Sequence, residues 1–134
     1  MGVFSKGSNM ISETNITVIA KNTEFQGELT CEGIVQIDGK YDGKIVANGS
    51  IIIGTDGKVN GEFFANEIVV NGELYGKIDA DKVRIGEKGR VRAIIVSEVF
   101  AISEGGVFEG EKKFKLKKDE NKDREYIDMD TDIV

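Results

Sequence analysis

The sequence predicts an all-β protein, a single-stranded β-helix (β-solenoid) whose short strands wind into about six stacked coils. Three observations lead to this prediction. A β-branched apolar pair, followed by an apolar residue two positions before a turn, recurs six times along the chain. Within each recurrence, apolar residues alternate with small or polar ones, and glycine or an Asx-Gly pair marks the corners. Alternation with a period of two is typical of strands, and a short fixed repeat is typical of a solenoid.

The six recurrences follow one another in order, and their last residues are spaced by 15 to 18 positions. They span residues 17–27, 35–43, 51–61, 68–76, 83–93 and 100–110. A strand rises about 3.3 Å per residue, so a unit of this length holds about three strands before the next coil begins. With coils about 4.8 Å apart, six coils make a rod about 30 Å long around columns of stacked side chains.

The corner after the first strand of each coil has two lengths. Coils such as 53–59 and 85–91 have the longer corner, whereas Asp38-Gly39 and Asn71-Gly72 form a tighter one. A two-residue turn favours positive φ, so we expect positive φ at these two Asx-Gly pairs. The extra residues of the longer corners should bulge outward and leave the core in register.

One position outside the predicted core carries charges of alternating sign in successive coils. It is occupied by Glu28, Lys44, Glu62, Lys77, Ile94 and Glu111. If the coils stack in register, the first four residues form a vertical ladder in which opposite charges are neighbours. We interpret this ladder as a device that sets the register, with no catalytic role.

Composition excludes several classes of function. The net charge of −6 offers no basic surface for nucleic acid, and the glycines lack the spacing of a phosphate-binding loop, so neither nucleic acid nor nucleotide is expected as a partner. Histidine is absent and Cys31 is the single cysteine, which removes the histidine base of hexapeptide-repeat acyltransferases and the ligands of zinc hydratases. We expect no catalytic residues, no cofactor and no metal.

We expect one β-helix domain at residues 14–112, between a flexible N-terminal tail (1–13) and a charged, disordered C-terminal tail (113–134). The chain has neither an apolar run that spans a bilayer nor a signal peptide, which predicts a cytoplasmic protein. The N-terminal tail combines an apolar cluster with a cation, a pattern that suits shallow contact with an anionic membrane surface. The predicted membrane-contacting residues are Met1, Val3, Phe4 and Lys6.

The two terminal coils have no predicted helical cap, and the chain contains no proline to protect their open edges. Both coils are also apolar. We expect them to stack end to end into a homopolymer that does not close, which is a filament. The predicted polymerisation interface consists of Ile16, Val18, Phe25 and Leu29 at one end and Val99, Phe100, Ile102 and Phe108 at the other.

The glycine-cornered repeat, the motifs at 35–45 and 85–91 and the short N-terminus with Met, Phe and Lys resemble those of the bactofilin family over about residues 12–112. This resemblance implies a right-handed β-helix of three-sided coils. It also implies a bacterial cytoskeletal protein that forms filaments without nucleotide, lies at the inner face of the cell membrane and supports cell shape or positions cell-wall and morphogenesis proteins. The chain departs from many relatives in lacking proline in its tails and in having Ala93 where the other coils have an anchor glycine.

A second hypothesis remains open at this stage. The chain could be an enzyme or an enzyme subunit on a soluble β-solenoid, trimeric and dependent on carboxylates, because Asp and Glu are abundant. Within the repeats, Asp38, Asp42, Asp56 and Asp79 fall at corners, where Asp is favoured because its side chain caps turns.

Overall fold

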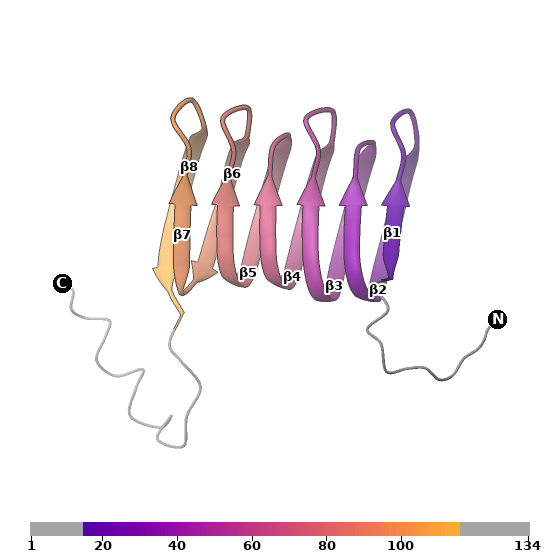
Figure 1. The fold of residues 1–134 in the computed structure, drawn as a ribbon, viewed down its shortest axis with the longest axis horizontal. Coiled ribbons are helices and arrows are strands. Elements are labelled where there is room, and N and C mark those ends of the chain that lie inside the picture. Colours follow the sequence, from indigo (N-terminus) through magenta and orange to yellow (C-terminus); the bar gives the residue numbers. More distant parts are fainter. Residues whose placement is uncertain (1–14, 116–134) are drawn as a thin grey trace, which may run out of the picture.

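The computed structural model describes residues 15–115 and shows a rod of six stacked coils built from β-strands (Figure 1). Every pairing is parallel and joins a strand to the strand one coil further on, in the order β1-β2-β3-β4-β5-β6-β8, with β7 paired to β5. The predicted all-β solenoid of about six coils is therefore confirmed. The strands are β1 Ile16–Ile19, β2 Glu24–Ile37, β3 Lys40–Ile53, β4 Lys58–Val70, β5 Glu73–Ile85, β6 Arg90–Ser97, β7 Val99–Ile102 and β8 Val107–Phe114.

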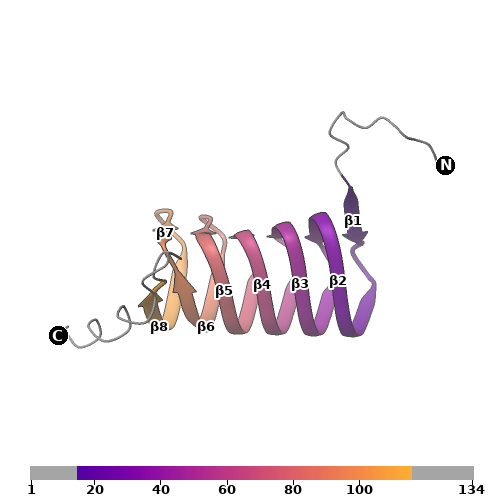
Figure 2. The same cartoon turned by 90° about the horizontal axis from the view of Figure 1, so that it is seen from below.

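Each coil has three sides, because the long strands β2 to β5 continue around corners, as their curvature in Figure 2 shows. Residues of successive coils pair one to one along each side, apart from one register shift between Val46 and Ser50. Face A consists of residues 16–19, 34–37, 50–53, 67–70, 82–85 and 99–102; face B of 24–26, 40–42, 58–60, 73–75, 90–92 and 107–109; face C of 28–31, 44–47, 62–65, 77–80, 94–97 and 111–114.

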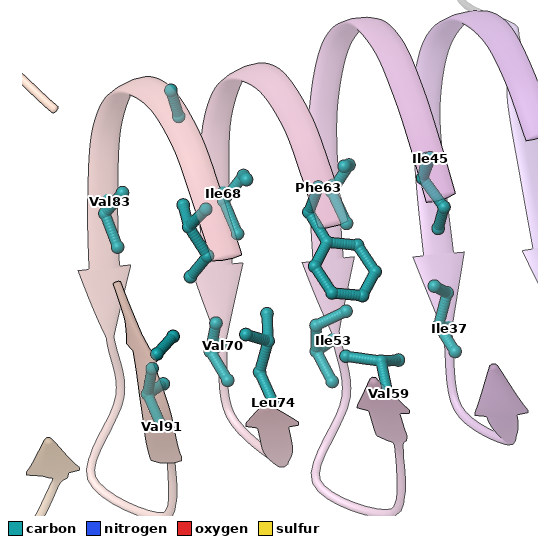
Figure 3. Close-up of a cluster of buried hydrophobic side chains, with 14 of the residues drawn as sticks. Ile37, Ile45, Ile53, Val59, Phe63, Ile68, Val70, Leu74, Val83 and Val91 are labelled. Atoms are coloured by element: carbon teal, nitrogen blue, oxygen red, sulfur yellow. The ribbon is translucent and has the colours of Figure 1, made fainter. Parts of the chain in front are cut away.

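The core consists of columns of inward-pointing side chains that run along the rod (Figure 3). Strand alternation sends every second side chain inward, so each face supplies its own columns. Burying one aliphatic side chain contributes about 1.5 to 3 kcal/mol. A rod one coil wide is thus stabilised mainly along its length, by contacts between neighbouring coils. The buried columns include Val35, Ile51, Ile68 and Val83; Ile37, Ile53, Val70 and Ile85; Tyr41, Val59, Leu74 and Val91; and Ile45, Phe63, Ile78 and Ile95.

The anchor glycines turn the chain from face B to face C. Gly43 and Gly61 both have φ +141°, a conformation that L side chains rarely adopt, and a Cβ at either would meet the backbone of the anchor glycine in the preceding coil. Ala93 occupies the same register position in the fifth coil, paired with Gly76 and Gly110, but it has no positive φ. The fifth coil therefore makes this corner with an ordinary backbone conformation.

The prediction of positive φ at Gly39 and Gly72 is wrong. Glycine is required there for a different reason. A Cβ at Gly39 would collide with the carbonyl oxygens of Ala20 and Thr23, and one at Gly72 with those of Gly54 and Gly57. The tight corners nest against the longer corners of the preceding coils, and Figure 1 shows these long and short loops along one edge of the rod.

The register predicted from the charge ladder is confirmed, because Glu28 pairs with Lys44, Lys44 with Glu62 and Glu62 with Lys77. Within residues 15–115, however, none of these side chains forms an ion pair with its neighbour in the ladder. The Lys44 ammonium instead lies 5.4 Å from the centre of the Phe64 ring. Exposed ion pairs contribute little, so a cation–π contact competes with them easily.

Candidate polymerisation interface

The N-terminal end of the rod is formed by β1 and by the first part of β2. β1 pairs only with residues 34–37, so residues 24–33 have no strand on their outer side within the described part of the chain. Their inward side chains, Phe25, Leu29 and Cys31, therefore end the core columns at this face. Leu29 and Cys31 pack against the core, whereas Phe25 is 38% exposed.

Phe25 is supported from below by Tyr41 in the next coil. Their rings are stacked, with centroids 5.3 Å apart and planes inclined by 6°. The Tyr41 hydroxyl lies 2.7 Å from the carbonyl oxygen of Gly27 and 2.8 Å from that of Lys44, so its one hydrogen can be donated to either acceptor. Burial, with a smaller effect from the Glu28 carboxylate, raises the pKa of Tyr41 above 10.0. The N-terminal face therefore carries an aromatic ring on a rigid, neutral support.

The C-terminal end is formed by β7 and β8. Phe100, Ile102 and Phe108 follow Val83, Ile85 and Val91 in their columns and complete them. The Phe100 and Phe108 rings lie 5.3 Å apart at 60°, and Ile102 is 43% exposed. Strand β8 ends at Phe114, two residues beyond the expected end of the core. These three side chains are the ones that a further coil would cover.

Three of the predicted interface residues point sideways instead. Thr17 and Ile19 take the inward positions of β1, so Ile16 and Val18 face outward on face A. Val99 likewise pairs with the exposed Lys82 on the outer side of face A. An apolar run at a coil end does not by itself show which side chains complete the core, because alternate residues point to opposite sides.

Sequence reasoning missed Lys112, which occupies an inward position at the C-terminal face. It pairs with Ile95, so a cation stands where the other coils have Leu, Ile or Phe. Its ammonium donates to the carbonyl oxygens of Ser97 and Lys113, each at 3.1 Å, and lies 5.1 Å from the centre of the Phe114 ring. Burial lowers the pKa of Lys112 below 10.5. Counting two residues from the anchor Gly110, as in the other coils, would have found it.

The last described residue, Lys115, ties the final coil to the side of the rod. Its backbone N–H donates to the Ser97 carbonyl oxygen at 2.8 Å. Its ammonium lies 3.1 Å from Asp79 and 3.2 Å from Asp81, two coils back. Burial alone would lower the pKa of Lys115, but the bonds to both carboxylates raise it above 10.5. Lys115 thus holds the end of the last described coil against face C of the rod.

In the described part of the chain, both ends offer the same kind of chemistry, namely exposed apolar side chains beside edge-strand backbone groups that no further strand pairs with. Such edges pair readily with another chain. Within residues 15–115 no group of three or more His, Cys, Asp or Glu could hold a metal ion, and no helix in this part is long and apolar enough to cross a membrane. The predicted membrane-contacting residues Met1, Val3, Phe4 and Lys6 lie outside the described residues.

Comparison with known proteins agrees with this architecture. Residues 17–113 match the family model Bactofilin, described as polymer-forming cytoskeletal. The fold is similar to that in a cryo-EM reconstruction of Thermus thermophilus bactofilin double helical filaments, with a TM-score of 0.70, 27% identity, and 73% of this chain and 98% of that chain covered. It is also similar to the cytoskeletal bactofilin BacA determined by solid-state NMR, with a TM-score of 0.66, 25% identity, and 76% and 98% covered. No curated protein matches the chain.

Proposed function

The chain belongs to the bactofilin family of polymer-forming cytoskeletal proteins, and we propose that it assembles end to end into filaments that act as a scaffold in the cell. Assembly requires neither nucleotide nor metal, because the joint is made of apolar side chains and edge-strand backbone. The filament itself is the functional product, and the chain is no enzyme. The relative from Thermus thermophilus forms double helical filaments. This supports the proposal that two protofilaments of the present chain also pair side by side.

The observation that carries this proposal is the incomplete core at both ends of the rod. Phe25 and Leu29 at one end, and Phe100, Ile102 and Phe108 at the other, stand in core columns with nothing stacked on them in the described chain. Covering them removes apolar surface from water and pairs the open edges. Both gains require only another copy of the same chain.

Lys112 constrains the geometry of the joint. A following copy that continued the coils in the same register would place Lys112 against Leu29 and Glu111 beside Glu28. The first contact would bury a cation in an apolar column, and the second would align like charges. The joint is therefore made chiefly on faces A and B, or with the copies rotated relative to each other.

The test is Phe108→Arg, compared with Val107→Arg at the outward-facing neighbour. An arginine at position 108 would be left unpaired in the joint, at a cost of about 3 kcal/mol or more. This raises the concentration needed for assembly more than about a hundredfold. Phe108→Arg should keep its far-UV circular dichroism and stay in the supernatant on centrifugation, whereas Val107→Arg should sediment as filaments. Since Phe108 is partly buried, Ile102→Arg serves as a second variant, and filaments from both folded variants would contradict the proposal.

A membrane role for the N-terminus forms the second part of the proposal. Val3 and Phe4 would insert shallowly, with Met1 beside them, and Lys6 would meet anionic headgroups. One copy binds weakly, so the filament supplies the many contacts that stable binding needs. This arrangement would place the polymer at the inner face of the cell membrane, where it could support cell shape and hold cell-wall or morphogenesis proteins.

Liposome co-sedimentation tests the membrane role. The intact protein should sediment with anionic liposomes, and a variant lacking residues 2–8 should remain polymeric but release the lipid. Equal partitioning of both polymers onto liposomes would contradict a membrane-contacting N-terminus. The enzyme hypothesis gains no support from the family match, because the family is described as polymer-forming cytoskeletal.

A further inference from the structure

Face A differs from the other two faces in its outward side chains. Over the first four coils, faces B and C carry at least one charged side chain per coil, whereas the outward positions of face A carry one charge in all, Glu67. The remaining outward positions are apolar except for Gln36 and Ser50. We define the face A patch as Ile16, Val18, Ile34, Ile52 and Val69.

The face A patch has at least one apolar side chain in each of the first four coils, with Gln36, Ser50 and Glu67 among them. Ile16 pairs with Ile34, and Val18 is followed in its column by Gln36, Ile52 and Val69. Ile16 and Val18 are 60% and 54% exposed, and the other three are partly buried by their neighbours. The patch ends at the fifth coil, where Arg84 reaches back to Glu67 at 3.9 Å.

We infer that the face A patch is the lateral contact between two protofilaments and that it packs against face A of a second copy. This inference rests on the filament of the proposed function. A flat sheet face of β-branched side chains fits a second such face at about 10 Å separation, as in a β-sandwich. A lipid surface would instead favour protruding aromatic side chains, and the patch contains none.

The size of the patch explains why the second copy must belong to a filament. Four coils of about 4.8 Å, each with a strand about 13 Å long, give about 250 Å² per copy. A stable interface between separate proteins buries about 800 Å² per partner. Two free copies therefore do not pair through face A. Copies joined end to end present the patch repeatedly, and many weak contacts then act together.

The experiment compares two double substitutions that add the same charges on different faces. Ile52→Lys with Val69→Lys changes the face A patch, and Val46→Lys with Ile94→Lys changes exposed apolar residues on face C. We expect the face A variant to form single protofilaments with about half the mass per unit length of the unsubstituted filament. The face C variant should keep the paired filament. Electron microscopy and mass-per-length measurement give the result, with circular dichroism to confirm folding.

A milder variant, Ile52→Thr with Val69→Thr, keeps β-branched side chains and covers the case in which the lysine variant fails to fold. Paired filaments from a folded face A variant would overturn the inference, as would single protofilaments from the face C variant. If the unsubstituted protein forms only single protofilaments, the inference is overturned but end-to-end assembly stands. If the unsubstituted protein forms no filaments at all, the proposed function is overturned. If the face A variant stays paired but loses binding to phosphatidylglycerol vesicles, the patch contacts lipid and the inference is wrong.

Discussion

The two ends of the rod complete the same core columns in different ways. At the N-terminal end all the terminal inward side chains are uncharged, and Phe25 stands on the stacked ring of Tyr41. At the C-terminal end, faces A and B finish with Phe100, Ile102 and Phe108, but face C finishes with Lys112. Within residues 15–115, the N-terminal end is thus open to contact on all three sides and the C-terminal end on two.

An inward charge is a known way to protect the edge of a sheet from further pairing. Here it protects one side of one end only. The difference between the two ends shows that the three sides of an open β-helix end can differ in their ability to bind another coil. On each side, a single inward residue decides whether another coil can stack there. Substitutions at the two ends can therefore be compared directly.

The largest effect should come from charging both ends at once. Phe25→Arg combined with Phe108→Arg places an arginine in a core column at each face, so neither end can be covered without burying a charge. We expect a folded monomer by light scattering after size exclusion. The matched control, Gln26→Arg with Val107→Arg, changes the outward-facing neighbours and should still form filaments. A polymeric double variant would mean that neither end column takes part in the joint.

The second prediction removes the difference between the ends. Lys112→Leu restores an apolar side chain beneath Ile95 and should raise the free energy of unfolding by about 1 kcal/mol. It should also lower the concentration at which filaments form, because face C of the last coil can then be covered. Denaturant titration and a sedimentation series measure the two effects. Lys113→Leu, at the exposed neighbour, should change neither the stability nor the assembly, and a destabilised Lys112→Leu variant would contradict the comparison.

Sequence periodicity was sufficient for the coil number, the strand register and most of the core, because each depends on a repeat that is visible in the chain. The directions of Ile16, Val18 and Val99 were missed, because an apolar run contains both inward and outward positions. The reason for glycine at positions 39 and 72 was also missed, because it depends on the backbone of another coil. The inward position of Lys112 was also missed, although its distance from Gly110 places it in the core column. The need for glycine at positions 39 and 72 therefore comes from packing between coils, which a local sequence pattern does not show.

The third prediction distinguishes the ends by pH. The raised pKa of Tyr41 means that its contribution to stability is fully present below pH 10.0 and is lost as the pH rises through its folded pKa. The lowered pKa of Lys112 acts in the opposite sense, because the folded ammonium is penalised until the pH rises through its folded pKa toward 10.5. Tyr41→Phe should therefore reduce alkaline destabilisation, although it loses the hydroxyl's hydrogen bonding to the backbone and starts from lower stability. Lys112→Met should increase alkaline destabilisation, because the stability gained as the buried Lys112 ammonium loses its proton is no longer available.

Urea unfolding from about pH 9 to about pH 11 measures both slopes. Lys115 and Tyr75 also have raised pKa values. Both groups are present in each variant and in the unsubstituted protein, so their effects on the slope cancel when the two are compared. Equal slopes for Tyr41→Phe and the unsubstituted protein would show that Tyr41 does not carry the alkaline loss.

The smallest effect should appear at Cys31, the single cysteine, which lies inward at the N-terminal face. A joint with the copies rotated, so that face C of the N-terminal end is covered, would shield the thiol, and maleimide labelling should then be several-fold slower in filaments than in the monomeric double variant. The same comparison with residues 2–8 deleted from both proteins separates cover by a second copy from cover by the chain's own N-terminus. If the difference persists after the deletion, the N-terminal face is buried in the joint. Equal labelling rates in polymer and monomer would instead mean that the joint leaves face C of the N-terminal end uncovered and is made on faces A and B.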